Sequence, residues 1–207
     1  MSVIFTSCSE SSEPVVLGDY EAGILISAEG AFGSKDGSVS YVDEALMEEP
    51  SNYIYDAVNG AQLGGLVQSV AFSDTHAYII VNDANSVVVV DRYTFERKAV
   101  INTGFENPRY MAIVGDKGYV TNWGTDTYTV DDDYLAVIDL NTNTLTDETI
   151  SLSFGVEQIV ASADKLYVSH KGAWTSNSII SVVDIANNNA VTEVTVCLLY
   201  TSDAADD

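Results

Sequence analysis

The chain has 207 residues, of which 46% are hydrophobic, so it can bury one sizeable core and is not a disordered acidic segment. Eight lysine and arginine residues oppose 31 aspartate and glutamate residues, for a formal net charge of −23. This balance argues against nucleic acid as a partner and disfavours an anionic membrane surface, because both need clustered basic side chains.

Two further classes of protein are disfavoured by the sequence. No apolar stretch reaches the roughly 18 residues that a membrane-spanning helix requires. The two cysteines, Cys8 and Cys197, are too few for a disulfide framework and show no spacing typical of zinc ligands.

Residues 1–22 are expected to be a truncated signal segment followed by a tether. The stretch FTSC, which ends at Cys8, resembles the lipobox that precedes a lipidated cysteine, and the polar SESSEP after it suits a flexible linker. The match is incomplete, because seven residues cannot hold a basic region and an apolar region. Cys8 is therefore either a lipidation site or an ordinary thiol.

From residue 23 to residue 196 the sequence repeats with a period of about 45 residues. Four segments end in a β-branched run followed by an aspartate, at spacings of 48, 48 and 45 residues. Because the aspartate recurs at one position of the repeat, we expect it to accept hydrogen bonds from the backbone of the next turn. These residues are Asp43, Asp91, Asp139 and Asp184.

Each repeat is predicted to contain four short strands separated by turns rich in Gly, Asn and Asp. The first repeat begins at its second strand, GILIS, and continues with SVSYVD and NYIYDAV; the second comprises VQSVAFS, AYIIVN, SVVVVD and RKAVIN. One such sheet cannot bury both of its faces, so neighbouring sheets must stack around a central channel. The predicted fold is all-β: a β-propeller of about four four-stranded blades in an incomplete ring.

The repeat resembles a known family. Tyr119–Asn122 reads YVTN, and the unit resembles the YVTN-repeat (YncE-like) family of seven-bladed propellers. The stretches AEGAFGSKDGSVSYVD, NGAQLGGLVQS and GFENPRYM are more similar to surface propeller lipoproteins of Gram-negative gut bacteria. The resemblance implies seven blades, of which about three are missing here, and a lipidated Cys8 that holds the protein at the outer membrane on the cell surface.

The end of the chain, Cys197–Asp207, fits none of the repeat patterns. Read back into codons, CLLYTSDAADD resembles the transposase adapter used in short-read sequencing. We therefore expect three segments: a signal segment and tether at 1–22, a partial propeller at 23–196 and a non-native tail at 197–207.

Signs of catalysis are sparse. His76 lies in a predicted turn and His170 at the end of a predicted strand, and neither belongs to a catalytic or metal-binding motif. The run that contains Asp131, Asp132 and Asp133 could supply oxygen ligands to calcium, but it lacks the spacing of a known calcium loop, so a solvated charge run is favoured. We predict no enzyme activity, no cofactor and no metal site.

The aromatic residues point to a binding surface instead. In a propeller the loops between second and third strands share one rim with the loops that lead into the next blade. Aromatic side chains there would suit planar or sugar ligands, and Arg109 could meet a carboxylate or phosphate; alternatively, these rings only pack between blades. The predicted ligand-binding residues are Phe32, Arg109, Tyr110, Trp123, Tyr128 and Trp174, with Phe105 and Phe154 on the same rim.

The leading hypothesis is a non-enzymatic surface lipoprotein that captures a ligand at this rim. By resemblance the ligand is a cobalamin-like compound or a glycan, an outer-membrane transporter is a partner, and the complete ring is a monomer. Two alternatives stay open: a protein–protein scaffold on the outer membrane, and a quinoprotein- or lactonase-type enzyme whose active residues lie in the missing blades.

Overall fold

The computed structural model describes residues 17–46, 48–128 and 131–199. Over this part of the chain the secondary structure is almost all β: one two-stranded and three four-stranded antiparallel sheets, joined by turns. No helix in the described part has the length and hydropathy needed to cross a membrane. Cys8 and residues 200–207 lie outside the described residues.

The elements follow the repeat. The first sheet holds β1 (Gly23–Ala28) and β2 (Ser38–Asp43), followed by the helix α1 (Ile54–Asn59). The second holds β3 (Val67–Phe72), β4 (His76–Val81), β5 (Ser86–Asp91) and β6 (Arg97–Ile101). The third holds β7 (Pro108–Val114), β8 (Lys117–Asn122), β9 (Tyr134–Asp139) and β10 (Thr144–Ser151). The fourth holds β11 (Val156–Ser162), β12 (Lys165–His170), β13 (Asn177–Asp184), the 3-10 turn Ile185–Asn187 and β14 (Ala190–Leu199).

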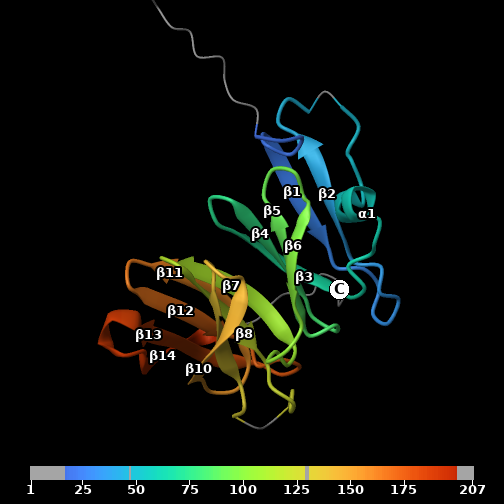
Figure 1. Cartoon of the computed structure of the whole chain (residues 1–207). Coiled ribbons are helices and arrows are strands. Elements are labelled where there is room, and N and C mark those ends of the chain that lie inside the picture. Colours follow the sequence, from blue (N-terminus) through green and yellow to red (C-terminus); the bar gives the residue numbers. More distant parts are fainter. Residues whose placement is uncertain (1–16, 47, 129–130, 200–207) are drawn as a thin grey trace, which may run out of the picture.

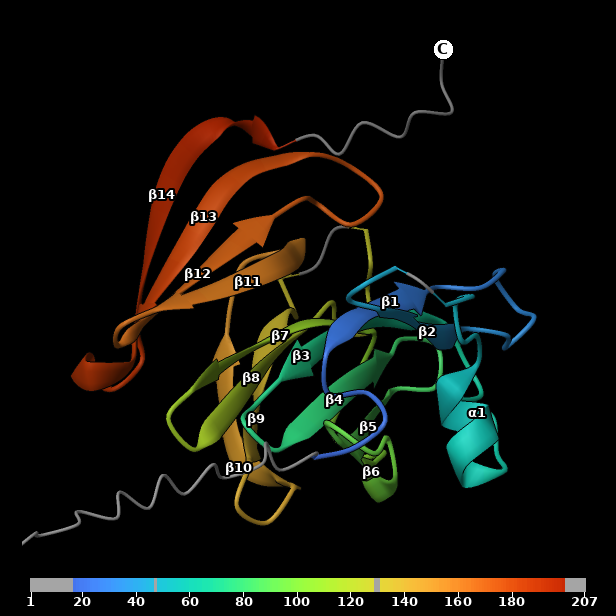
Figure 2. The same ribbon diagram turned by 90° about the horizontal axis from the view of Figure 1, so that it is seen from above.

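The sheets succeed one another in chain order (Figures 1 and 2). Within each four-stranded sheet the strands pair in the order in which they occur in the sequence. Between sheets, β7 contacts both β3 and β11, so the first strands of successive sheets lie next to one another. Sequential four-stranded meanders with adjacent first strands are the arrangement of a β-propeller, and the predicted fold class is confirmed.

The core lies between the sheets, because successive residues of a strand point to opposite faces. On β4, Ala77 and Ile79 pack in the cluster shared with the first sheet, whereas Tyr78 and Ile80 pack in the cluster shared with β7–β10. The sheets β3–β6 and β7–β10 thus bury apolar side chains on both faces, which explains their unbroken β-branched runs.

One predicted element is wrong. The segment NYIYDAV was expected to be the outer strand of the first sheet, but its residues from Ile54 onward form α1. Ile54 and Tyr55 are buried in the cluster between the first two sheets. Gly60 ends the helix with a φ of 63°, and its backbone N–H donates a hydrogen bond to the carbonyl of Asp56. A glycine in this left-handed conformation after apolar residues at helical spacing is a C-cap signal that the strand assignment overlooked.

The repeated aspartates Asp91, Asp139 and Asp184 accept hydrogen bonds from the turn that follows them, as predicted. Oδ1 of Asp91 accepts the amide N–H groups of Tyr93 and Thr94, both at 3.0 Å. Oδ1 of Asp139 accepts the amide of Asn141 at 2.8 Å. The carboxylate of Asp184 accepts hydrogen bonds from backbone amides of the turn that follows it. It also forms an ion pair with Lys165, with Nζ 2.5 Å from Oδ2. These carboxylates therefore fix the turn between the third and fourth strands.

The fourth sheet continues past the expected end of the propeller segment at Val196. β14 runs to Leu199, and its pairing with β13 extends to Leu199 opposite Asn177. The segment boundaries themselves stay a prediction.

Candidate functional site

One rim of the propeller is formed by two kinds of loop, those between second and third strands and those that lead into the next sheet. Hydrogen bonds join each loop to its neighbour, as the loop pattern predicted. Along the rim these bonds are Gly37 N–H to the carbonyl of Gly65, Asn107 N–H to Oδ1 of Asn85 (2.8 Å), Asn107 Nδ2 to the carbonyl of Gly124 (3.0 Å), Phe154 N–H to Oδ1 of Asp131 (2.9 Å), and Gly172 N–H to the carbonyl of Gly155 (3.1 Å).

Trp123 is the anchor of this rim between the third and fourth sheets. It directly follows β8, is 5% exposed, and donates its indole N–H to the carbonyl of Val156 at 2.5 Å. Its ring packs in the cluster between these two sheets. The indole is thus held by the first residue of the neighbouring sheet and offers little surface to solvent.

Arg109 and Glu157 form a buried ion pair across the same junction. Nη2 and Nε of Arg109 donate to the two carboxylate oxygens of Glu157, at 2.9 and 3.3 Å. The guanidinium carbon lies 4.0 Å from the centroid of the Trp123 ring, which is cation–π geometry. Because the pairing is bidentate and both residues are at most 9% exposed, the positive charge of Arg109 is already neutralised.

The two charged residues occupy one position of the repeat. Each lies three residues before the residue that pairs with the repeated tyrosine: Arg109 on β7 and Glu157 on β11. On β3 this position holds Gln68, whose Nε2 donates to the hydroxyl of Tyr110 at 3.4 Å. Its Oε1 is buried and has no partner within the described part of the chain.

Trp174 is the exposed member of the group. It lies in the tight turn between β12 and β13, where the amide of Thr175 donates to the carbonyl of Gly172 at 2.6 Å. Its ring is 67% exposed and meets Trp123 edge to face, with centroids 6.0 Å apart at 69°. Gly172 has a φ of +89°, which favours glycine. A Cβ on Gly155 would lie 2.3 Å from the Cα of Gly172. Both glycines are therefore needed for the two loops to meet.

The remaining predicted binding residues are spread along the rim. Tyr110 is half-buried and packs against the cluster between the third and fourth sheets, as does Phe154. Phe105 is buried between the second and third sheets. Phe32 and Tyr128 are 89% and 62% exposed on their loops. The structure thus brings Arg109, Trp123 and Trp174 into contact.

The acidic run is less solvated than expected. Asp131 is exposed, but Asp133 is buried, and its Oδ2 accepts the amides of Gly155 and Val156 at 2.7 and 2.8 Å. Burial raises the pKa of Asp133 to about 7, against the opposing effect of these two amides. Asp132 accepts the amide of Thr125 at 2.8 Å. The solvated interpretation is therefore wrong for Asp133, which holds the loop into the fourth sheet.

The described residues include no group of three or more His, Cys, Asp or Glu side chains placed to hold a metal ion. His170 ends β12, is fully buried, and has Nδ1 at 3.1 Å from the carbonyl of Phe154 and Nε2 at 2.8 Å from Oγ of Ser181. Burial lowers the pKa of His170, and both ring nitrogens have partners inside the fold, which is the placement of a structural residue. His76 begins β4 rather than lying in a turn.

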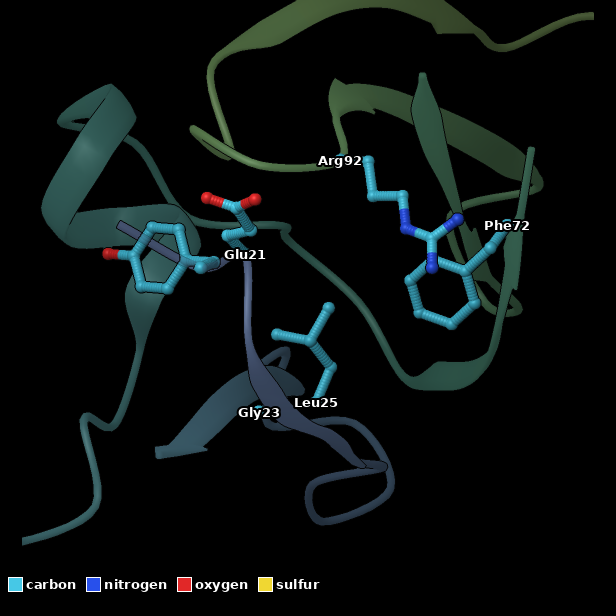
Figure 3. A pocket seen from close by; sticks show the side chains of 6 residues that line it. Glu21, Gly23, Leu25, Phe72 and Arg92 are labelled. Atoms are coloured by element: carbon cyan, nitrogen blue, oxygen red, sulfur yellow. The ribbon is translucent and has the colours of Figure 1, made fainter. Parts of the chain in front are cut away.

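A small cavity lies away from this rim, at the ends of β3 and β5. It has a volume of about 160 Å³, and its wall combines β1 and the segment before it with the second sheet (Figure 3). The guanidinium of Arg92 lies over the Phe72 ring at 5.5 Å and donates to the carbonyl of Ser73, so it is already engaged. The lining residues are Tyr20, Glu21, Gly23, Leu25, Phe72 and Arg92.

Sequence reasoning missed Glu157 and Gln68. Both lie on innermost strands, whereas the predicted site residues are aromatic and cationic residues expected in or beside the loops. Alignment of the repeats on their tyrosines would have placed Gln68, Arg109 and Glu157 at one position and shown opposite charges on adjacent blades.

Comparisons with known proteins bear on the fold. The structure is similar to Kuenenia stuttgartiensis hydrazine synthase, with TM-score 0.63, 16% identity, and 84% of this chain and 51% of that chain covered. It is also similar to dihydro-heme d1 dehydrogenase NirN in complex with DHE, with TM-score 0.58, 18% identity, and 90% of this chain and 37% of that chain covered. A third similar structure is a putative 6-phosphogluconolactonase from Bacteroides fragilis, with TM-score 0.54, 13% identity, and 83% of this chain and 53% of that chain covered.

At these identities the likeness concerns the fold alone. The chain spans between about a third and about half of the length of these three solved structures. None of the curated proteins matches the chain in sequence. A family model, described as "Domain of unknown function (DUF5074)", matches residues 22–202. The chain, a β-propeller by its fold, therefore belongs to the DUF5074 family.

Proposed function

We propose that this propeller captures a small ligand at its loop rim, at the junction of the third and fourth sheets, and that its role is binding rather than catalysis. The observation that carries the proposal is the exposed indole of Trp174, held edge to face on the buried Trp123. An exposed aromatic ring supported by a fixed second ring offers a flat apolar surface with a polar edge.

The aromatic surface formed by Trp174 and Trp123 is rigid because Trp123 is held in place from behind. Trp123 is fixed by its bond to Val156 and by the guanidinium of Arg109, which Glu157 in turn holds. Little side-chain freedom is then lost when a ligand stacks on this surface. Because Arg109 is neutralised by Glu157, recognition rests on stacking and on loop polar groups, which favours a neutral planar or sugar ligand over an anion.

The proposed ligand class is supported by the aromatic surface and by the resemblance of the repeat. A corrin-type ring, as in cobalamin, and a glycan both present broad faces that stack on indole. A catalytic role is less well supported, since the described carboxyl group with a strongly raised pKa, Asp133, is buried and binds backbone amides. The scaffold alternative would leave the rim without a small-molecule ligand.

For the location we propose the outer membrane at the cell surface, through a lipid on Cys8, with an outer-membrane transporter as the receiver of the ligand. The support is the FTSC stretch and the polar segment after it. Metabolic labelling with a radioactive fatty acid tests the anchor: label is expected on the protein and absent from a Cys8→Ala variant. Label retained by Cys8→Ala would contradict this part of the proposal.

The test of binding is isothermal titration with cobalamin and with a panel of glycans. Trp174→Ala should weaken binding by about 1–3 kcal/mol, the usual range for an aromatic anchor, with the melting temperature nearly unchanged. Phe72→Ala, an exposed aromatic residue away from the rim, is the matched control and should bind normally. If no probe binds, or if Trp174→Ala binds as well as the wild type, the rim is not the binding site and the scaffold reading takes precedence.

A further inference from the structure

A buried carboxyl group, that of Asp133, lies between the third and fourth sheets, directly behind the two indoles of the rim. Asp133 precedes β9 and is 2% exposed. Its Oδ2 accepts the backbone N–H groups of Gly155 and Val156 at 2.7 and 2.8 Å, and its own carbonyl accepts the N–H of Leu152 at 2.9 Å. One residue at the start of β9 thus holds the segment that leads into the fourth sheet.

The two peptide groups held by this carboxyl group also position both indoles. The carbonyl of Val156 accepts the indole N–H of Trp123 at 2.5 Å. The carbonyl of Gly155 accepts the N–H of Gly172 at 3.1 Å, and Gly172 begins the turn that presents Trp174. The two glycines are so close that a Cβ on Gly155 would lie 2.3 Å from the Cα of Gly172. A displacement of this segment therefore moves both rings.

The second oxygen of the same carboxyl group is a place for a proton. Oδ1 of Asp133 is buried and has no hydrogen-bond partner among the residues that the structure describes. A carboxylate with a charged oxygen buried and unpaired is costly, and a neutral carboxyl group that carries its proton there costs less. The neutral group still accepts both N–H groups through Oδ2. The geometry thus allows either state while the contacts to the fourth sheet remain.

The charges on the same segment act on this proton. Burial, together with the negative charges of Asp132 and Asp131, raises the pKa of Asp133 to about 7, against the opposing effect of the two backbone N–H groups. The proton is therefore exchanged near neutral pH, where an ordinary aspartate has long been ionised.

The fourth sheet brings three further ionisable groups to this segment. Glu157 directly follows Val156 and is paired with Arg109. His170 has Nδ1 at 3.1 Å from the carbonyl of Phe154, and burial lowers its pKa against the effect of Glu193 on β14. Because the pKa of His170 lies below its ordinary value and that of Asp133 is about 7, the two groups titrate in separate ranges of pH.

We propose that Asp133 is the positioning residue for Trp123 and Trp174, and that one proton on its carboxyl group changes how firmly both indoles are held. Its consequence for binding rests on the proposed function, in which these indoles are the ligand surface. Hydrogen bonds to an ionised acceptor are about twice as strong as those to a neutral one. Loss of the proton therefore tightens the segment of Gly155 and Val156, and ligand affinity should rise with pH.

The wild-type chain tests this link without any ligand, because it contains two tryptophans and both lie at this site. In a ¹⁵N-labelled sample the two indole N–H signals are followed from about pH 5 to about pH 9. Both should shift in one step with a midpoint at about pH 7, and Trp174→Phe assigns the signals. Indole signals that stay fixed over this range, or that move with different midpoints, overturn the inference.

Asp133→Asn removes the titrating group and keeps an oxygen that can accept the two N–H groups. Its indole signals should show no step near pH 7, whereas Asp139→Asn, the matched control, loses a turn contact outside the rim and should titrate like the wild type. His170→Gln should also keep the step. A step that persists in Asp133→Asn, or that is lost in a folded His170→Gln, assigns the proton to another group and overturns the inference.

Circular dichroism checks the fold of each variant. If Asp133→Asn does not fold, the ¹³C signal of the Asp133 carboxyl group is followed in the wild type instead. This signal should titrate with the midpoint of the indole signals, and a different midpoint overturns the inference.

Isothermal titration separates this inference from the proposed function. A probe that binds the wild type, cobalamin or a glycan of the panel, should bind about fivefold more tightly at about pH 8 than at about pH 6. Its affinity for Asp133→Asn should not change between these values. If no probe binds at either pH, the proposed function fails and the indole titration still decides the role of Asp133. Binding to the wild type that is independent of pH overturns the inference and leaves the proposed function in place.

Discussion

The second and fourth sheets are built from the same repeat and differ in their surroundings. β3–β6 lies between two other sheets, and Tyr78, Ile79, Val87 and Val89 have no exposed surface. β11–β14 has a neighbour on one side, so Val168 is buried while Tyr167 next to it is 37% exposed. The comparison shows that the contribution of a side chain to stability here depends on the next sheet more than on its position in the repeat.

The largest expected difference in the free energy of unfolding is between variants of the repeated tyrosines. Tyr78→Ala should lower the free energy of unfolding by about 3–5 kcal/mol, because it leaves a cavity between two sheets and removes the bond to Asn143. Tyr167→Ala, at the equivalent position, should cost less than about 1 kcal/mol. Urea unfolding followed by fluorescence measures both. Equal losses would mean that the face of β11–β14 that carries Tyr167 is covered in solution.

The next test compares two ion pairs. Glu157→Gln should destabilise by about 3 kcal/mol, because the guanidinium of Arg109 stays buried without a carboxylate. Lys165→Met breaks the exposed pair with Asp184 on the fourth sheet and should leave the melting curve almost unchanged. A double variant, Arg109→Met with Glu157→Gln, is expected to recover part of the loss. If Glu157→Gln alone melts like the wild type, the pair does not secure the junction.

The smallest expected effect concerns pH and the link between the third and fourth sheets. The pKa of Asp133 is about 7 in the folded chain, above that of an unfolded aspartate. The folded state therefore binds this proton more tightly, and stability falls as pH rises from about 4 through 7. Between pH 5 and 8 the wild type should lose about 1–3 kcal/mol more than Asp133→Asn. Parallel pH profiles for the two proteins would show that the carboxylate is already ionised at pH 5.

Most of the fold could be predicted because its causes are local and repeated. The alternating β-branched runs and the turn aspartates specify strands and turns within each sheet, whatever lies beside it. α1 could not be predicted this way, since Ile54 and Tyr55 are apolar at positions that suit either a strand or a helix, and their burial against the second sheet decides. The first sheet is also where the repeat is least regular.

The candidate site could be predicted only in outline. The loop aromatics led to the prediction of a site on this rim, which stays a prediction, and the sequence treats Trp123 and Trp174 alike. Their difference arises from Val156, which fixes one indole, and from the Gly172 turn, which presents the other to solvent. The partner of Arg109 is 48 residues away in the chain. Such a contact depends on how the sheets stack, which no single repeat encodes.

The position shared by Gln68, Arg109 and Glu157 also bears on how the repeats avoid misassembly. Successive blades are alike enough to be exchanged during folding, which is a known hazard of repeat proteins. Only one order sets the guanidinium beside the carboxylate. A blade placed out of turn would leave one of these charges buried without its counterpart, at a cost of several kcal/mol. The charge at this one position thus distinguishes the third sheet from the fourth, and a blade in the wrong place would carry an energetic penalty there.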